Sequence, residues 1–208
     1  MPAPLPLGLV LAGGLARRMG GGDKARIAIG GATILARVLA RLAPQCVRVI
    51  LNANGDPARF ADSRLPVVPD DVPGFAGPLA GILAGLDWAA AHASEVADIA
   101  SVPGDCPFLP SDLIARLAAA RAAAGKSLAC ARSGEWRHPV VGLWPVALRH
   151  DLRKAVVEED LHKIEAWTER HGVAIADWPD APYDPFFNVN TPQDVATAER
   201  IAAQHRDI

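Results

Sequence analysis

The sequence contains few cysteines and few aromatic residues. Among its 208 residues are three cysteines, Cys46, Cys106 and Cys130, and a single tyrosine. An odd number of cysteines with no Cys-x-x-Cys pair argues against both a disulfide framework and a zinc site. Three unpaired cysteines are consistent with a reducing cytoplasm. Cys106 could in principle be a nucleophile, but no base accompanies it at a definable position, so we expect it to be a small buried residue.

The chain also lacks long apolar runs and a large net charge of either sign. Its first apolar run, residues 7–12, is too short for a signal peptide or a membrane span, and no basic region precedes it. The formal net charge is −2, so no broad positive field points to nucleic-acid binding. We therefore expect a soluble cytoplasmic protein that binds neither nucleic acid nor membranes.

The residues that are abundant favour an α/β fold. Half of the chain is hydrophobic, and strand-like runs alternate with helix-like patterns in its first 125 residues. This alternation predicts a mostly parallel sheet with helices on both faces, a three-layer α/β/α, Rossmann-like arrangement. The strands predicted in this part are 7–12, 47–51, 66–68 and 99–102, and the helices are 33–42, 78–93 and 110–124.

The last third of the chain has a looser pattern. A final helix opens after Asn190, with Thr191 as its N-cap and Pro192 at its first position. Because a chain of this length fits one core, we expect a single domain over residues 1–208. The other elements expected here are strands at 128–131, 140–144 and 173–176 and helices at 147–157 and 162–171.

A glycine-rich loop follows the first predicted strand. Residues 13–24 contain five glycines together with Arg17, Arg18 and Lys24. Glycine lets backbone N–H groups crowd an anion, and the cations neutralise it, so the loop predicts a polyphosphate site. It is not a Walker loop, because Ala25 follows the lysine where a hydroxyl is required. The match of 20–25 to a dinucleotide fingerprint is discounted, because the strand stops near residue 12.

Three more predicted strands end in polar side chains: Asn52, Asp70 with Asp71, and Asp105. Ligands of open α/β sheets bind beyond the carboxyl ends of the strands, which parallel strands bring to one edge. A carboxylate at position 105 can hold Mg²⁺, which prefers oxygen ligands from one or two carboxylates and from substrate phosphates. For each of these residues the plain alternative is a turn residue that bonds to its own backbone.

The ordered string from Leu11 to Lys24, Leu-Ala-Gly-Gly-x-x-x-Arg-Met-Gly-Gly-x-Asp-Lys, resembles the signature of the molybdenum cofactor guanylyltransferases. The resemblance implies a nucleotidyltransferase fold and a magnesium-dependent reaction. It also extends to 52–54 and to Asp70 followed by 77–81, regions that contact the guanine nucleotide in the family. The spacing to 77–81 favours Asp70 over Asp71 as the residue that contacts the base.

The resemblance implies roles for individual residues of the N-terminal half. Arg18, Lys24 and Asp105 would be catalytic, and Asp105 would hold Mg²⁺. The residues implied to contact GTP are Leu11, Ala12, Gly13, Gly14, Lys24, Asn52, Asp70 and Asp105.

A second matching segment, 187–192, has the sequence Phe-Asn-Val-Asn-Thr-Pro. Period-two spacing places Asn188 and Asn190 on one side of an extended segment, where their amides can reach a metal, a phosphate or a pterin. The resemblance implies that Asn188 and Asn190 bind the pterin together with His138, which belongs to an Arg-His-Pro triplet. This pterin-binding side would lie in the C-terminal third of the chain. The plain alternatives are a helix N-cap with a loop residue, and an ordinary surface histidine.

The implied reaction joins GTP to the terminal phosphate of molybdenum-bound molybdopterin and releases pyrophosphate. One alternative is a related cytidylyltransferase or sugar-phosphate nucleotidyltransferase, but the cytidylyltransferases of this cofactor show Leu-Ala-Ala-Gly where this chain has Leu-Ala-Gly-Gly at 11–14. A second alternative is a non-catalytic carrier of the cofactor. Transient contacts with cofactor-biosynthesis proteins or apo-molybdoenzymes are also expected.

Overall fold

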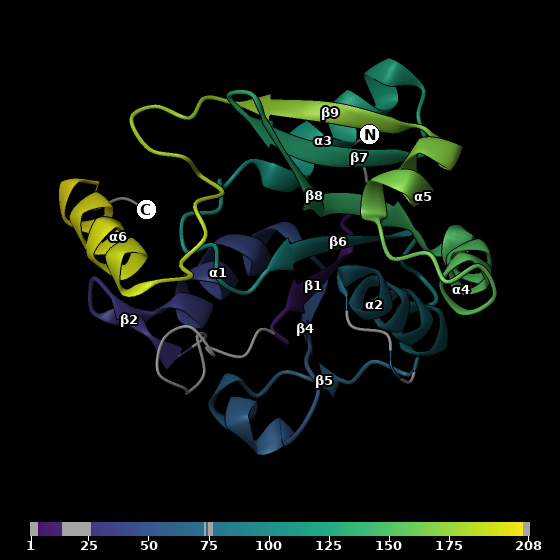
Figure 1. The fold of residues 1–208 in the computed structure, drawn as a ribbon, viewed down its shortest axis with the longest axis horizontal. Helices are drawn as coiled ribbons and strands as arrows, with labels where there is room; N and C mark the ends of the chain where they lie inside the picture. Colours follow the sequence, from purple (N-terminus) through teal and green to yellow (C-terminus); the bar gives the residue numbers. More distant parts are fainter. Residues whose placement is uncertain (1–3, 14–25, 73, 75–76, 206–208) are drawn as a thin grey trace.

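A twisted sheet forms the middle layer of the computed structural model, which describes residues 4–13, 26–72, 74 and 77–205 (Figure 1). In this part of the chain the sheet has seven strands in the order β5-β4-β1-β6-β8-β7-β9, and β2 and β3 form a separate two-stranded ribbon. The strands are β1 (Leu7–Leu11), β2 (Ala28–Ile29), β3 (Ala32–Thr33), β4 (Arg48–Asn52), β5 (Val67–Val68), β6 (Asp98–Pro103), β7 (Leu128–Ser133), β8 (Trp136–Pro145) and β9 (Val173–Trp178).

Strand direction decides where the polar strand ends lie. Strand β1 pairs in parallel with β4 and with β6, and β4 pairs in parallel with β5. Within the described sheet β8 alone runs the other way, antiparallel to β6 and β7, while β7 and β9 are parallel. The mostly parallel sheet is therefore confirmed, and the carboxyl ends of β1, β4, β5 and β6 share one edge. Because β8 is reversed, its first residues lie at that same edge.

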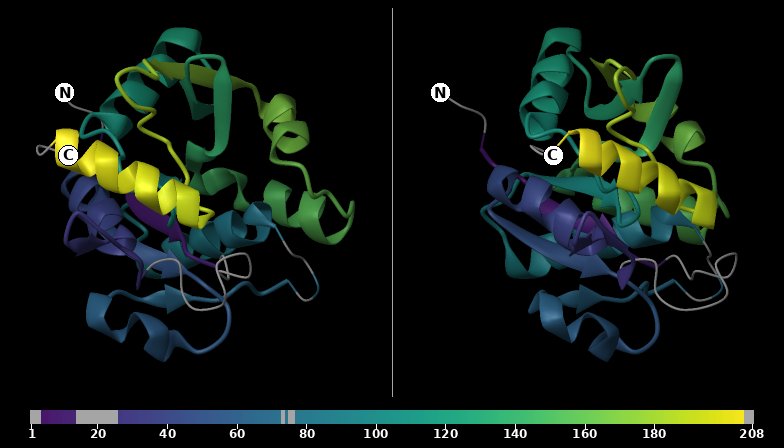
Figure 2. Two further views of the ribbon diagram at one scale, coloured as in Figure 1. Left: turned by 60° about the vertical axis from the view of Figure 1, so that its left-hand side comes forward. Right: turned by 90° about the vertical axis from the view of Figure 1, so that its left-hand side faces the viewer.

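Helices cover both faces of the sheet, which confirms the three-layer arrangement (Figures 1 and 2). Helices α1, α3 and α6 share one apolar cluster with the sheet, and α2, α4 and α5 share the other. Figure 2 shows α6 lying beside the β2–β3 ribbon, where the Gly30 amide donates to Glu199 Oε2 at 3.0 Å. The helices are α1 (Ile34–Leu42), α2 (Pro78–His92), α3 (Leu113–Ala124), α4 (Arg149–Val157), α5 (Ile164–His171) and α6 (Pro192–Gln204).

Local chemistry explains where α1 and α6 begin. The Thr33 hydroxyl accepts from the Ala36 amide at 3.1 Å, as expected of an N-cap. Thr191 and Asp194 form a reciprocal capping box at the start of α6. Both predicted caps are confirmed.

Helix α3 begins at Leu113, three residues later than the sequence pattern predicts. The Gln45 side chain explains the difference: its amide nitrogen donates to the Pro110 carbonyl at 3.0 Å, and its oxygen accepts from the Ile114 amide at 3.0 Å. A distant side chain thus satisfies an amide of the first turn and keeps the segment from Pro110 outside the helix.

The β2–β3 ribbon is absent from the predicted elements. Gly30 and Gly31 connect its two strands with φ of +58° and +82°, a left-handed pair that glycine adopts without strain. None of the helices in the described ranges combines the length and the apolar character needed to cross a bilayer.

Candidate active site

The predicted polyphosphate loop follows β1, which lies between β4 and β6 in the sheet. At the end of β1 the Leu11 carbonyl accepts from the Gly104 amide at 2.9 Å, and the Ala12 amide donates to the Asn52 carbonyl at 2.8 Å. Gly13 is exposed and follows directly. The ends of β4 and β6 therefore flank the start of the loop. Gly14, Arg18 and Lys24 lie outside the described residues.

The ends of β4 and β5 form a cluster of amides around one carboxylate. The buried Asn52 donates from Nδ2 to Asp70 Oδ1 at 2.8 Å and to the Val68 carbonyl at 3.1 Å. Asn54 donates from Nδ2 to Asp70 Oδ2 at 2.7 Å, and its own oxygen accepts from the Asp70 amide at 2.8 Å. Each carboxylate oxygen of Asp70 thus accepts a hydrogen bond from one side-chain amide and has a second lone pair that a ligand could use.

Asp71 belongs to a different set of contacts. Its Oδ2 accepts from Arg153 Nη2 on α4 at 2.5 Å. The two neighbouring carboxylates are therefore separated by their partners: Asp70 lies with Asn52 at the strand ends, and Asp71 is paired with a helix.

Helix α2 packs against this cluster through Gly81. A Cβ at that position would lie 2.3 Å from Asn52 Oδ1 and 2.7 Å from Leu11 Cδ2, closer than real Cβ atoms come to other atoms. The absence of a side chain at 81 thus leaves room for the Asn52 amide that holds Asp70.

Replacing Gly81 by alanine is expected to displace Asn52, raise KM for the nucleotide, and lower the free energy of unfolding by about 1–3 kcal/mol. The matched control is Gly85→Ala, one turn along α2, where the new Cβ would meet Leu9 Cδ2 at 2.6 Å in the apolar core. It should destabilise similarly with no change in KM. Equal KM values for the two variants would contradict the role given to Gly81. Steady-state kinetics and chemical denaturation make the comparison.

Asp105 lies in the turn that follows β6, beside the end of β1. Its side chain is partly buried, and its carbonyl oxygen accepts from the Val189 amide at 3.0 Å. The segment before α6 is thus attached directly to the turn that carries the predicted magnesium ligand. Among the described residues no three His, Cys, Asp or Glu side chains gather as a metal site. The Asp105 carboxylate is an oxygen donor of the kind that Mg²⁺ prefers, whereas zinc sites are built mainly from Cys and His side chains.

The Cys106 thiol reinforces this attachment. It donates to Asn188 Oδ1 at 2.9 Å and lies 3.4 Å from the Phe186 carbonyl oxygen. Complete burial, followed by the charges of Asp105 and Asp184, raises the pKa of the Cys106 thiol well above its usual value. Cys106 is buried, as predicted, and its thiol is a neutral donor that orients a neighbouring amide.

Asn188 and Asn190 flank the buried Val189, as the alternating pattern predicts. The Asn188 side chain is exposed, and Asn190 is half-buried. The backbone amide of Asn190 donates to Asp194 Oδ2 at 2.9 Å, and the backbone amide of Thr191 donates to the same oxygen at 2.8 Å. Because Asp194 already accepts hydrogen bonds from these backbone amides at the start of α6, a phosphate bound at this end would have to be held by side chains.

His138 lies near the start of β8 and faces the same segment. Its Nε2 is 2.6 Å from Ser133 Oγ, and its ring lies 4.7 Å from that of Phe186. Burial lowers the pKa of His138, against an opposing effect of Asp184. The neutral imidazole is therefore favoured, which suits a hydrogen-bonding role better than a fixed positive charge.

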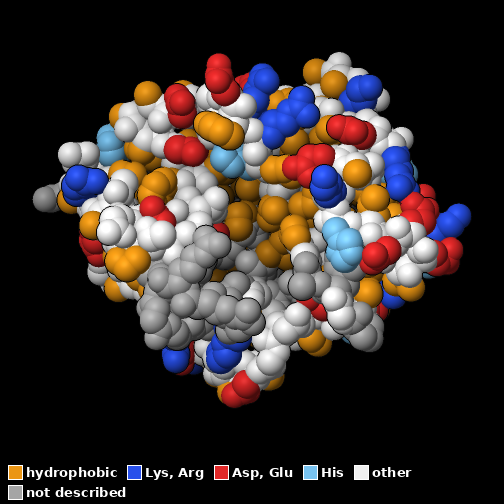
Figure 3. Space-filling model, in the orientation of Figure 1, with side chains coloured by type: hydrophobic (Ala, Val, Ile, Leu, Met, Phe, Trp, Pro, Cys, Tyr) orange, Lys and Arg blue, Asp and Glu red, His pale blue; other side chains and the backbone are white. Residues whose placement is uncertain are grey.

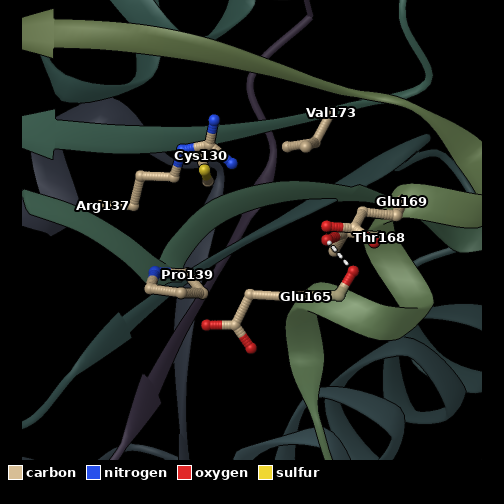
Figure 4. A pocket seen from close by; sticks show the side chains of 7 residues that line it. All are labelled: Cys130, Arg137, Pro139, Glu165, Thr168, Glu169 and Val173. Carbon is tan, nitrogen blue, oxygen red and sulfur yellow. Dashed lines mark hydrogen bonds between the residues drawn. The ribbon is translucent and has the colours of Figure 1, made fainter.

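Three hollows help to locate the site. Figure 3 shows a hollow at the centre of one face, in which hydrophobic side chains gather. A cavity of about 20 Å³ lies among side chains of β7, β8, β9 and α5, including Cys130, Arg137 and Glu165 (Figure 4). A cavity that small holds about one water molecule and no organic substrate.

The third hollow, of about 780 Å³, lies at the opposite edge of the sheet, where β1 and β6 begin. Most of its lining is apolar, and its arginine, Arg121, is paired with Asp98 through two contacts of 2.6 Å. Such a surface offers little to a polyphosphate. The carboxyl edge, with its carboxylates and amides, is the better candidate site.

Comparisons with known proteins indicate the family of the chain. Residues 8–175 match the family model described as the MobA-like NTP transferase domain. The molybdenum cofactor guanylyltransferase of Bradyrhizobium sp. (strain ORS 278) is 63% identical over 196 residues, which cover 94% of this chain and 92% of that protein. The chain belongs to the molybdenum cofactor guanylyltransferase family.

Two further comparisons extend this result. The guanylyltransferase of Nitrobacter hamburgensis is 58% identical, covering 96% of each chain. The crystal structure of molybdopterin-guanine dinucleotide biosynthesis protein A from Archaeoglobus fulgidus superposes with a TM-score of 0.71 at 22% identity, covering 95% of this chain and 99% of that one. That structure supports the nucleotidyltransferase fold, and the relatives identify the chain as a nucleotidyltransferase enzyme.

The structure of this family member brings most of the described site residues to one edge of the sheet. They form two groups, one around Asp70 at the ends of β4 and β5, the other around Asp105 and the segment before α6. Three contributors lie outside the predicted set: Asn54, Cys106 as a donor, and Gly81. Asn54 was visible in the sequence as part of the 52–54 match, whereas no local signal reveals the thiol contact.

Proposed function

We propose that this chain transfers GMP from GTP to the terminal phosphate of molybdenum-molybdopterin, forming the guanine dinucleotide cofactor and releasing pyrophosphate. The observation that carries the proposal is the Asp70 carboxylate, held by the Asn52 and Asn54 amides beside the strand from which the glycine-rich loop leaves. It offers a base-recognition group next to a predicted phosphate site. Relatives named for this activity, at 63% and 58% identity, support the same conclusion.

Asp70 suits guanine because of hydrogen-bond polarity. Guanine presents a ring N–H and an exocyclic amino group side by side, both donors, and a carboxylate is an acceptor-only group. Adenine and cytosine carry no such donor pair. The amides of Asn52 and Asn54 keep the carboxylate fixed, so discrimination does not require it to reorganise.

The phosphates of GTP would lie over the loop at 13–24. Arg18 and Lys24, with the loop N–H groups, would neutralise charge on the departing pyrophosphate, while Leu11, Ala12, Gly13 and Gly14 would border the nucleotide. Asp105 would hold Mg²⁺, which when bound supplies Lewis-acid charge neutralisation at the phosphates.

The chemistry needs little proton transfer. The attacking phosphate oxygen is already an anion, so alignment and charge neutralisation are what the enzyme supplies. On the acceptor side, His138, Asn188 and Asn190 would orient the pterin substrate. The contact between Asp105 and Val189 joins this acceptor side to the nucleotide side.

The cellular setting follows from the substrates and from the thiols. The three cysteines of the chain are free, which suits the reducing cytoplasm where we place the reaction. Transient contacts with cofactor-biosynthesis proteins or with apo-molybdoenzymes would bring the pterin and remove the product.

Arg18→Ala and Lys24→Ala are each expected to lower the rate of guanylyl transfer by about 10²- to 10³-fold, by analogy with the loss of an oxyanion donor. Arg26→Ala is the control, since Arg26 is an exposed partner of Asp62 at 3.4 Å. Single-turnover kinetics measure the loss. Wild-type turnover in either of the first two variants would contradict the assignment.

The activity itself is tested by pyrophosphate release with GTP, CTP, ATP and UTP, each assayed without an acceptor, with molybdenum-molybdopterin and with a sugar phosphate, and pterin binding is measured alongside. Release with GTP that depends on the cofactor supports guanylyl transfer. Release with CTP instead would identify a cytidylyltransferase, and release that depends on a sugar phosphate would identify that class. No release with any nucleotide, together with tight pterin binding, would leave a cofactor carrier.

A further inference from the structure

Arg153 joins three elements that lie far apart in the sequence. Its Nη2 contacts Asp71 Oδ2 at 2.5 Å, after β5, and Asp87 Oδ2 at 2.6 Å, on α2. Among the described residues Arg149, one turn earlier on α4, pairs with Asp87 only, with its Nε 3.8 Å from Oδ1. Arg153 therefore bridges the segment at 70–71 to α2, and Arg149 does not.

The bridge bears on nucleotide recognition because Asp71 directly follows Asp70. Adjacent Cα atoms are held about 3.8 Å apart across a peptide bond, so a displacement of the backbone at Asp71 is passed on in part to Asp70. Asp70 is fixed on its other side by Asn52 and Asn54. The segment is thus held from two directions, by the strand ends and by α4.

Charge gives the bridge a second effect. Asp71 and Asp87 approach one guanidinium nitrogen, so without Arg153 two carboxylates would face each other. Their repulsion would push the 70–71 segment away from α2, the helix whose Gly81 packs on Asn52. The hydrogen bonds to Asp71 and Asp87 raise the pKa of Arg153, so its charge is permanent.

We infer that Arg153 is a positioning residue for guanine recognition: by fastening Asp71 to α2 it keeps Asp70 aligned for the base. The inference rests on the proposed function. Arg153 does not touch the nucleotide in this scheme, and it acts through Asp70.

The solvent exposure of the Arg153 bridge determines which measurement reveals its loss. The side chains of Arg153, Asp71 and Asp87 are 37%, 51% and 32% exposed. Ion pairs this close to solvent contribute little to global stability. Loss of Arg153 should therefore change nucleotide affinity much more than it changes unfolding.

The test compares Arg153→Ala with Arg149→Ala in the full-length protein. Arg153→Ala is expected to raise KM and Kd for GTP about fivefold, the upper range for an exposed ion pair, with kcat within about twofold of wild type. Arg149→Ala should remain close to wild type in all three. Arg153→Lys should recover part of the affinity, because its ammonium can reach both carboxylates but lacks the planar fork.

A double-mutant cycle separates positioning from a structural role. In an Asp70→Ala background, Arg153→Ala should have no further effect on KM for GTP, because the residue it positions is gone. An equal further rise in that background, or an unchanged KM in the single variant, would overturn the inference while leaving the proposed function intact. Absence of GTP-dependent pyrophosphate release by the wild-type protein would instead overturn the proposed function, and the inference with it.

Discussion

Replacing Asp105 by alanine is expected to lower kcat/KM for guanylyl transfer by about 10³-fold or more. Asp105 is the carboxylate on the turn that contacts the end of β1 and the segment before α6, where both substrates are proposed to meet. Its loss removes the anchor for the ion that neutralises the phosphates. Initial rates of pyrophosphate release at GTP concentrations below KM, with the pterin saturating, measure the effect.

A magnesium titration shows whether the loss arises at the metal. Asp105→Asn should require a much higher Mg²⁺ concentration for half-maximal rate, since a neutral amide is a weaker ligand than a carboxylate. Asp62→Ala is the control, because Asp62 is almost fully exposed and pairs only loosely with Arg26. An Asp105→Asn variant with an unchanged Mg²⁺ requirement would contradict the proposed role.

Phe186→Ala is expected to lower the free energy of unfolding by about 3–5 kcal/mol. Phe186 is 1% exposed; its ring packs edge-on against Trp178, with the ring centroids 5.3 Å apart, and at a tilt against His138, with the centroids 4.7 Å apart. The cavity left behind would loosen the segment that carries Asn188, so KM for the pterin should rise as well. In a chain of this length the loss corresponds to a fall in melting temperature of about 6 to 20 °C.

The adjacent Phe187 provides a matched control. It is half-buried and packs at the margin of the same apolar cluster. Phe187→Ala removes the same atoms from a less enclosed site, so its destabilisation should be clearly smaller. If thermal and chemical denaturation gave the same loss for both variants, Phe186 would not be the anchor described here.

Much of the fold could be predicted because its signals are local. The apolar runs that become β1 and β4, and the hydroxyls of Thr33 and Thr191 that cap helices, depend on residues close in the sequence. The start of α3 could not be predicted, because the side chain that caps it, Gln45, lies 69 residues before the amide it binds. The reversal of β8 was likewise set by pairing with β6, a contact distant in sequence.

The candidate site, like the fold, has features that could be predicted from the sequence and others that could not. The sequence placed Asn52, Asp70 and Asp105 at strand ends, and parallel pairing explains why they share an edge. From the spacing to 77–81 the sequence favoured Asp70 over Asp71, but the contact of Asp71 with Arg153, 82 residues away, could not be predicted. The thiol contact between Cys106 and Asn188 spans a further 82 residues. Such contacts exist only once the tertiary structure has formed.

The hairpin formed by β7 and β8 has a consequence for how relatives of this chain can diverge. Its tip, with Trp136 76% exposed, stands at the edge of the sheet where the acceptor is proposed to bind. Insertions at such a tip cost little free energy, because a surface loop lengthens without disturbing the layers beneath it. Changes at this tip could therefore alter what approaches the proposed acceptor side without touching Asn52 and Asp70, which lie at the ends of other strands.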